Sequence, residues 1–344
     1  MKKKTSIWII RFLLFLGTAI SLFYVPWPIV IAWLTPMPQT IQEQVDKATD
    51  YGFDGIIVCV NKTGNHSEFY TSGYKNRETQ TPADPNSLFK IASVDKLYTA
   101  LAIAKLVSDG QLALDQNLAH YFPDLKDRIE NSDKITIRMM VQHRSGIPNY
   151  TSTYNYWAHP KTNDNERLEL VLDLPANFEP DTDYEYCNTN YLLLSQLIEK
   201  VSGKNKFQYL KENILDPLNL KNTYGSIHDV NMDDVMSGYY VGYEYDLKTD
   251  DNDAMLATAE DLAKFIRALN DGSVFKNKEE QEIYSSIYKF EHTGLIPGYQ
   301  TIARYYEDVD AVVIQFTNTV NFDGYNWNMS EIMYNRIVKI IRSN

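Results

Sequence analysis

The sequence has few cysteines and no excess of basic residues. Its two cysteines, Cys59 and Cys187, stand far apart, and no Cys/His cluster has the spacing of a zinc site. We expect two buried free thiols, with a disulfide as the less favoured alternative. With 33 Lys and Arg against 45 Asp and Glu, the net charge is -12. No basic stripe can neutralise phosphates, so we predict no nucleic-acid partner.

Internal repeats and low-complexity tracts are also absent from the 344 residues, which suffice for a core of two lobes. The hydrophobic content of 44% and the charged content of 23% are ordinary for a globular protein. Tyrosine is abundant, at 25 residues. A polar and aromatic stretch at 150–165 has no usable period. A second tyrosine-rich stretch at 233–253 is acidic, and we interpret it as a surface excursion.

The N-terminus combines a basic start with an apolar run. Four basic residues precede residues 12–34, which carry no charge: Lys2, Lys3, Lys4 and Arg11. As a helix this run would span about 34 Å, against roughly 30 Å of hydrocarbon in a bilayer. We predict a cytoplasmic tail at 1–11, a single-pass transmembrane anchor at 12–34, a linker at 35–40 and an extracytoplasmic domain at 41–344, periplasmic or at the cell surface. The alternative is a signal peptide cleaved near Ala19-Ile20-Ser21, which would leave a secreted protein.

Hydrophobic periodicity predicts strands near both ends of the domain and helices between them. The strands are expected at 55–60, 67–72, 287–293, 299–306 and 311–317. The helices are expected at 41–49, 94–107, 136–142, 188–201, 208–214, 259–270 and 329–341. This order indicates an α+β fold, with one antiparallel sheet built from both chain ends, flanking helices and a helical second lobe.

The first chemical element is a Ser-x-x-Lys motif, Ser93 to Lys96, at the start of the strongest predicted helix. The motif occurs five times, beginning at Ser72, Ser87, Ser93, Ser273 and Ser286. Only Ser93 opens a long amphipathic helix. Residues three apart share a helix face, so the Lys96 ammonium can reach the Ser93 hydroxyl. A free serine is a weak nucleophile and needs such a neighbour.

Two further elements complete a candidate catalytic set. Tyr186-Cys187-Asn188 precedes a predicted helix. A phenol beside an ammonium can be held partly as phenolate, which would let Tyr186 take the proton from Ser93 and later return one to the leaving group. Asn188 offers a donor and an acceptor to a substrate amide. His292-Thr293-Gly294 ends a predicted strand, and these residues would bind a substrate carboxylate or carbonyl. The backbone N–H groups of Ser93 and Leu295 would form an oxyanion hole.

In this order the three elements resemble the serine β-lactamase and penicillin-binding protein superfamily, in its class C β-lactamase-like branch. The stretches Gln142-His143-Arg144-Ser145-Gly146-Ile147-Pro148 and Asp216-Pro217-Leu218 add to the similarity. The resemblance covers roughly residues 41–341. It implies a sheet domain beside a helical domain with the site between them, and acyl transfer through an acyl-enzyme on Ser93. Lys96 and Tyr186 would manage protons, and neither metal nor cofactor is implied.

Three positions depart from the pattern of that family. Asp95 stands where a small or hydroxyl residue is common, and its carboxylate can pair with Lys96. Asp181 replaces a frequent glycine before Tyr186. Glu291 replaces the usual glycine before His292, and the alternation of strand side chains should point it away from the pocket.

The resemblance implies a hydrolase but does not identify its substrate. We expect a serine hydrolase acting on peptides or esters of the cell envelope, of the D-Ala carboxypeptidase, D-amino-acid peptidase or esterase type. One alternative is a β-lactamase proper. Another, from a different class, is a catalytically silent envelope-binding or sensor protein that uses the same cleft.

Overall fold

The computed structural model describes residues 2–252 and 254–343, and the side chains from residue 7 onward. Twelve α-helices are described: α1 (Lys2–Phe23), α2 (Trp27–Leu34), α3 (Ile41–Val45), α4 (Asp95–Ser108), α5 (Leu118–Tyr121), α6 (Ile137–Val141), α7 (Asp164–Glu169), α8 (Asn188–Ser202), α9 (Lys206–Leu210), α10 (Ala259–Asp271), α11 (Lys278–Ile287) and α12 (Asn326–Ser343). The strands are β1 (Gly55–Lys62), β2 (Glu68–Asn76), β3 (Thr81–Pro82), β4 (Phe89–Lys90), β5 (Thr223–Tyr224), β6 (Tyr239–Tyr240), β7 (Leu256–Ala257), β8 (His292–Ile296), β9 (Tyr299–Tyr306), β10 (Ala311–Thr317) and β11 (Thr319–Val320).

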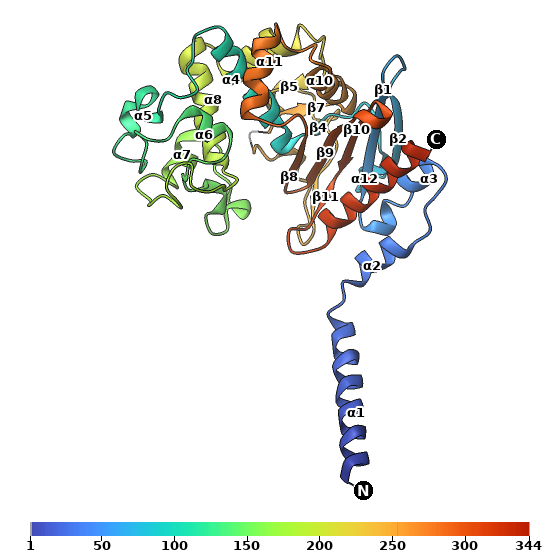
Figure 1. The fold of residues 1–344 in the computed structure, drawn as a ribbon. Helices are drawn as coiled ribbons and strands as arrows, with labels where there is room; N and C mark the ends of the chain where they lie inside the picture. The colour runs from blue at the N-terminus through green and yellow to red at the C-terminus, as the bar shows by residue number, and fades with distance from the viewer. Residues whose placement is uncertain (1, 253, 344) are drawn as a thin grey trace.

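The main sheet joins the two ends of the chain. Its order is β3-β2-β1-β10-β9-β8, and every neighbouring pair is antiparallel. The central β1–β10 pairing aligns Ile56 with Thr317 and Lys62 with Ala311, across about 250 residues of sequence. Figure 1 shows these early and late strands side by side. The prediction of one antiparallel sheet assembled from both chain ends is confirmed.

Helices cover both faces of this sheet because its central strands are apolar on both sides. Along β1, Ile57 and Cys59 face a core that includes α4 and α10, whereas Ile56 and Val58 face a core that includes α3 and α12. The two cysteines are buried free thiols, as predicted. Burial raises the pKa of Cys59 to about 12 and that of Cys187 to about 11.

The middle of the chain forms the predicted helical lobe. Helices α5, α6, α7 and α8 lie together in Figure 1, beside the sheet domain, and α4 packs against both α8 and α9. Helix α4 is almost entirely buried, which follows from the apolar residues that recur along it from Leu97 to Leu106. The segment that carries the first motif therefore lies where the two lobes meet.

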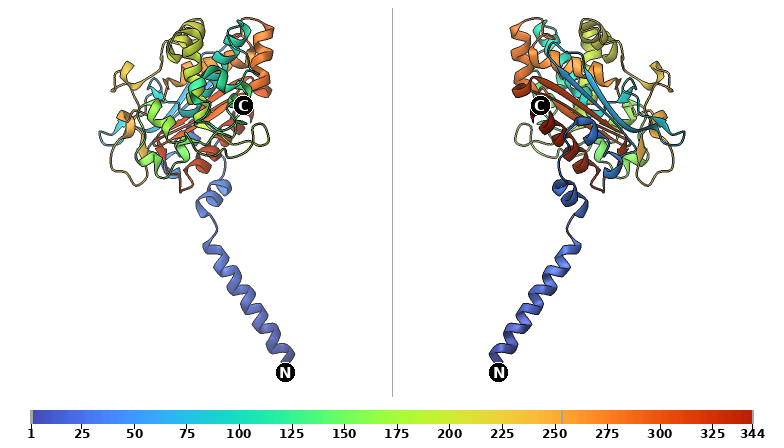
Figure 2. Two further views of the ribbon diagram at one scale, coloured as in Figure 1. Left: turned by 90° about the vertical axis from the view of Figure 1, so that its left-hand side faces the viewer. Right: turned by 90° about the vertical axis from the view of Figure 1, so that its right-hand side faces the viewer.

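The prediction of one continuous helix over residues 12–34 is wrong. The chain breaks after Phe23, and α1 and α2 are bent by 84°. Pro26 precedes α2 and has no N–H for a helical hydrogen bond, which explains the break. Among the described residues, no single helix is long and apolar enough to cross a membrane; the bent pair passes that test of length and composition only when taken together. Both views of Figure 2 show α1 extending away from the rest of the molecule.

Helix α2 and the segment after it contact the folded domain. Ala32 is buried, and the Arg336 guanidinium donates hydrogen bonds to the backbone carbonyls of Ala32, Thr35 and Pro36. Helix α3 then begins with a reciprocal capping box between Thr40 and Glu43.

One predicted strand is misplaced. The strand was predicted at 287–293, but Ile287 ends helix α11 (residues 278–287), which was not predicted, and β8 covers His292–Ile296. Asn277 caps the helix, and Tyr284 and Ile287, three residues apart, are buried on one helix face. Tyr and Ile both favour strands, but here their spacing lets them bury one face of a helix, and the segment is helical.

The tyrosine-rich acidic stretch is more than a surface excursion. It contributes β6 to a parallel two-stranded pairing with β11, and Tyr239 and Leu247 are buried. The buried Lys90 ammonium donates hydrogen bonds to the carbonyls of Leu247 and Asp250, which fixes this loop over the core. Burial lowers the pKa of Lys90 to about 8, although nearby carboxylates oppose the shift.

Candidate active site

Ser93 lies in a single 3-10 turn, Ala92–Val94, that leads into α4. The turn begins with Ala92 at φ +50°, a left-handed conformation that is uncommon for a residue with a side chain. Such strained backbone clusters at functional sites when the surrounding fold fixes it. Strand β8 packs against this turn, and Ser93 remains only half-buried.

Lys96 is buried one helical turn beyond Ser93. Its Nζ lies 3.3 Å from Ser93 Oγ. Burial alone would lower the pKa of this ammonium, but Tyr186 and Asp95 outweigh that effect and the pKa is raised. The same ammonium faces the rings of Tyr186 and Tyr191, 5.1 and 5.3 Å from their centroids. Lys96 is therefore a fixed positive charge beside the hydroxyl at neutral pH.

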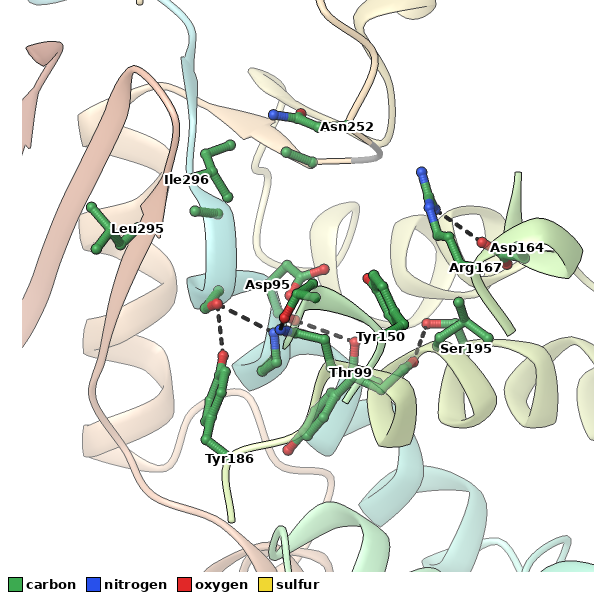
Figure 3. A pocket seen from close by; sticks show the side chains of 18 of the residues that line it. Asp95, Thr99, Tyr150, Asp164, Arg167, Tyr186, Ser195, Asn252, Leu295 and Ile296 are labelled. Carbon is green, nitrogen blue, oxygen red and sulfur yellow. Dashed lines mark hydrogen bonds and ion pairs between the residues drawn. The ribbon is translucent and has the colours of Figure 1, made fainter. Parts of the chain in front are cut away.

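Tyr186 approaches the same hydroxyl from the loop before α8. Its phenol oxygen lies 2.6 Å from Ser93 Oγ. In Figure 3 a dashed line marks the hydrogen bond of the Tyr186 hydroxyl, and Leu295 and Ile296, from β8, are labelled among the residues that line the pocket. The structure thus brings together Ser93, Lys96 and Tyr186, the three residues predicted to carry the chemistry.

Gly294 determines how closely β8 approaches the Ser93 turn. An added Cβ would lie 2.4 Å from the carbonyl oxygen of Ile91 and 3.2 Å from the backbone nitrogen of Ser93. The absence of a side chain at Gly294 therefore makes room for the turn that carries Ser93. The sequence had predicted instead that this glycine would let a substrate approach the strand backbone closely. Strand β8 is the edge of the sheet, and Leu295 lines the pocket. The backbone N–H groups of Ser93 and Leu295 remain the predicted oxyanion donors.

The side chains of His292 and Thr293 lie outside the described lining of the main pocket. The His292 ring is buried and contacts the Tyr288 hydroxyl at 2.9 Å through Nε2, and the Thr293 carbonyl through Nδ1. Burial, followed by the charge of Lys289, lowers the pKa of His292 well below its usual value. Glu291 is exposed and lies 3.7 Å from the Arg304 guanidinium, so the predicted divergence of Glu291 from His292 is confirmed.

Asn188 begins α8 and lines the main pocket. Its Nδ2 donates a hydrogen bond of 3.0 Å to Thr151 Oγ1, and its backbone N–H donates to Asn149 Oδ1 at 3.0 Å. The loop that contains Asn149 and Thr151 thus holds Asn188 in the wall of the pocket. This position agrees with the predicted contact to a substrate amide.

His143 is a member of the site that the sequence motifs did not single out. It is 3% exposed, its ring centroid lies 4.5 Å from that of Tyr186, and its Nδ1 accepts the Cys187 N–H at 3.1 Å. Burial, followed by the charges of Lys96 and Lys289, lowers its pKa to about 3. The neutral ring therefore carries its proton on Nε2. Its only sequence signal was its place in the family-like stretch at 142–148.

The pocket extends from Ser93 between the two lobes as a cavity of about 170 Å³. Asp164, Arg167 and Ser195 lie on the side opposite Leu295 (Figure 3). Two ion pairs line the walls: Asp95 with Lys206 at 3.3 Å, and Asp164 with Arg167 at 3.0 Å. The pairing of Asp95 with Lys96 suggested by the sequence is replaced by this contact with Lys206, although Asp95 still helps to raise the pKa of Lys96.

A family model described as "Beta-lactamase" matches residues 37–288, which include Ser93, Lys96 and Tyr186. Strand β8 begins just beyond the matched range.

Known proteins from several bacteria are similar to this chain. Penicillin-binding protein 4* of Bacillus subtilis (strain 168) is 24% identical over 315 residues, which cover 77% of this chain and 68% of that protein. N-acetylmuramyl-L-alanine amidase of the same organism is 28% identical over 198 residues, covering 53% of this chain and 45% of that protein. Among solved structures, D-amino acid amidase from Ochrobactrum anthropi SV3 has a TM-score of 0.78 at 22% identity, covering 88% of this chain and 98% of that one.

Proposed function

Because this chain belongs to the beta-lactamase family, we propose that it is a serine hydrolase that forms an acyl-enzyme on Ser93. The observation that carries the proposal is the contact of one hydroxyl with two partners, the Lys96 ammonium at 3.3 Å and the Tyr186 phenol oxygen at 2.6 Å. Nucleophile and proton acceptor within hydrogen-bond reach are the recognisable signature of covalent catalysis.

The proposed acylation begins with attack of Ser93 Oγ on the carbonyl carbon of the substrate. In this proposal Tyr186 reacts as the phenolate, which takes the serine proton and becomes a phenol, while the Lys96 ammonium stabilises the negative charge beside it. The carbonyl oxygen becomes an oxyanion between the N–H groups of Ser93 and Leu295. The proton then passes to the leaving amine or alcohol as its bond to the carbonyl carbon breaks. Attack of water on the acyl-enzyme, by the reverse proton path, releases the acid and restores the serine.

The substrate class we propose is an amide, peptide or ester of the cell envelope, of the D-alanyl or D-amino-acid type. Two relatives support it by their names, a penicillin-binding protein and an N-acetylmuramyl-L-alanine amidase, and a structural neighbour is a D-amino acid amidase. Asn188 and the edge of β8 would hold the substrate amide and carbonyl beside Ser93. The Asp95–Lys206 and Asp164–Arg167 pairs offer charged contacts farther along the pocket.

We also propose that the domain acts outside the cytoplasm, where envelope substrates occur. The basic residues before the apolar N-terminal run support this orientation. Protease added to spheroplasts or protoplasts, in which only the cytoplasmic membrane remains closed, should digest a C-terminal tag on the domain. Protection of the tag until that membrane is lysed would contradict the extracytoplasmic placement.

The hydrolase proposal is tested by labelling the purified protein with a fluorophosphonate and with a fluorescent β-lactam. The wild-type protein should be labelled by at least one acylating probe, and Ser93→Ala should lose the label and substrate turnover. Ser195→Ala is the matched control, because this serine lines the same pocket while its hydroxyl bonds to the Tyr191 carbonyl. Labelling that persists in Ser93→Ala would reject the assignment.

A panel of D-alanyl peptides, D-alanyl esters, short acyl esters and β-lactams then identifies the substrate. A stable β-lactam adduct would indicate a penicillin-binding type of enzyme, whereas rapid release would indicate a β-lactamase. A folded wild-type protein that no probe labels would favour the silent binding protein.

A further inference from the structure

Two aromatic stretches that the catalytic motifs leave unexplained meet beside the active site. The stretch at 150–165 and the tyrosine-rich stretch at 233–253 belong to different parts of the chain, yet both line one cavity of about 220 Å³. Trp157 comes from the first stretch, and Tyr240 and Tyr243 come from the second. Pro297, from the turn after β8, also lines this cavity.

The rings around this cavity form a connected series. Trp157 lies 5.3 Å from Tyr156 and 6.1 Å from Phe322, measured between ring centroids. Phe322 in turn lies 5.3 Å from Tyr240, and Tyr240 lies 5.1 Å from Tyr243. Phe322 is 39% exposed, so the series is not sealed inside the core. Trp157, Tyr240 and Tyr243 are partly exposed, so their rings are within reach of a ligand that enters the cavity.

The aromatic cavity adjoins the catalytic pocket. Thr151 and Trp157 line both spaces. Ile296 lines the catalytic pocket, and the next residue, Pro297, lines the aromatic cavity. Asn188, which is placed to contact the substrate amide, donates a hydrogen bond to Thr151 Oγ1 in the shared wall. The aromatic cavity therefore lies next to the space that a substrate bound at Ser93 would occupy.

The lining has the chemistry of a site for a neutral, flat and amphipathic group. All of its described residues are uncharged, and they combine aromatic faces with the hydroxyl and amide groups of Thr151, Thr153 and Asn155. Burial raises the pKa of Tyr240, which keeps that phenol neutral. In such a site a small number of polar groups fix the orientation of the ligand, and the aromatic rings supply most of the contact area. A sugar ring has this character, with C–H faces for the rings and hydroxyl edges for the polar groups.

We propose that this cavity is a binding subsite for a neutral sugar ring, an N-acetylated hexosamine, attached to the peptide or ester that Ser93 attacks. This inference deepens the proposed hydrolase function and rests on it. Thr151 Oγ1 is already bonded to Asn149 and Asn188, but Thr153 and Asn155 offer polar groups that an apolar acyl chain would not use, which favours the sugar. The carbohydrate portion would lie between Trp157 and Tyr243 while the scissile bond lies at the Ser93 hydroxyl.

The test is calorimetric titration of the full chain, in a Ser93→Ala background, with the N-acetylglucosamine trimer. We expect binding in the millimolar range or tighter. Tyr243→Ala should weaken it about fivefold to tenfold, as loss of one ring contact predicts. Tyr154→Ala is the matched control, because this tyrosine is in the same loop as Trp157 but is 96% exposed and lies outside the cavity lining. It should leave the affinity unchanged.

Probe labelling separates this proposal from the proposed hydrolase when it is done on matching proteins that keep Ser93, namely the wild type, Tyr243→Ala and Tyr154→Ala. Absence of trimer binding to a protein whose Ser93 is still labelled overturns the sugar subsite and leaves the hydrolase intact. Equal affinity in Tyr243→Ala, with Ser93 labelling retained, also overturns it. Tyr243-dependent binding of N-acetylphenylalanine amide, without binding of the trimer, would assign the cavity to an apolar side chain and overturn the proposal. Tyr243-dependent trimer binding by a protein that no acylating probe labels supports the subsite and rejects the hydrolase.

Discussion

Replacing His143 with asparagine is expected to make the protein less sensitive to acid. The imidazole is 3% exposed, and burial together with the charges of Lys96 and Lys289 lowers its pKa to about 3. His143 has a φ of +59°, a conformation that asparagine tolerates better than most residues. Asparagine Oδ1 can replace Nδ1 as the acceptor of the Cys187 N–H. The substitution thus removes the titrating group while keeping its hydrogen bond.

The size and sign of the effect follow from the two pKa values. In the unfolded chain a histidine titrates near 6.5, so below that pH the unfolded state binds a proton that the folded state does not take up until about pH 3. Stability contributed by the neutral ring is therefore present above pH 6.5 and is lost as the pH falls. The loss is about 1.4 kcal/mol per pH unit, or roughly 2–3 kcal/mol between pH 6.5 and 4.5.

Urea denaturation of wild type and His143→Asn at several pH values between 7.5 and 4.5 measures this difference. Burial also lowers the pKa of His292, and it raises the pKa of Asp250 and Asp261, but these groups are common to both proteins. Only the difference between the two curves reports on His143. The difference in free energy of unfolding should be constant above pH 6.5. Below pH 6.5 it should shift by about 1.4 kcal/mol for each pH unit of acidification, in favour of the variant.

The control is His228→Asn, because the His228 side chain is 73% exposed and lies outside the buried site. Its curve should run parallel to that of the wild type. Curves for wild type and His143→Asn that also remain parallel from pH 7.5 to 4.5 would refute the assignment of His143 as a neutral buried ring.

Two further substitutions test contacts that hold the site together. Gly294→Ala should lower kcat/KM by about tenfold or more, because the added Cβ would lie 2.4 Å from the Ile91 carbonyl and push β8 away from the nucleophile. Leu295→Ala, which leaves the strand backbone unchanged, should have a smaller effect in the same assay, and equal losses would contradict the reasoning. Glu280→Gln should lower the free energy of unfolding by about 3–5 kcal/mol, because it leaves the buried Lys105 ammonium without its carboxylate at 2.7 Å. Urea denaturation measures this loss, and a change below 1 kcal/mol would contradict it.

The nucleophile and its lysine could be predicted because their relation is local. Ser93 and Lys96 are three residues apart at the start of an apolar helical run, and helix geometry alone brings them together. The sheet was predictable for a similar reason, since the strands at both chain ends show apolar runs of strand length. Tyr186 was selected by a family pattern, because no local rule specifies which tyrosine will reach a serine 93 residues away.

The elements that could not be predicted depend on contacts between distant segments. Nothing in the stretch at 142–148 indicates that His143 will lie against the Tyr186 ring. The aromatic series around Trp157 likewise needs the positions of Tyr240 and Phe322, which the tertiary structure alone provides. The misassigned N-terminal helix is different, because the break at Pro26 was visible in the sequence, but hydropathy outweighed it in the prediction.

The charges around Lys96 determine which group can accept the serine proton in the proposed reaction. Asp95 and Tyr186 together hold the pKa of Lys96 above its usual value, despite complete burial of the ammonium. A lysine that is already protonated at neutral pH cannot take a second proton from Ser93. His143 is neutral, but its Nδ1 already accepts the Cys187 N–H and its Nε2 carries the proton. The oxygen of Tyr186, 2.6 Å from Ser93 Oγ, is therefore the group left for this role, and in its phenolate form it would accept the serine proton in the proposed acylation.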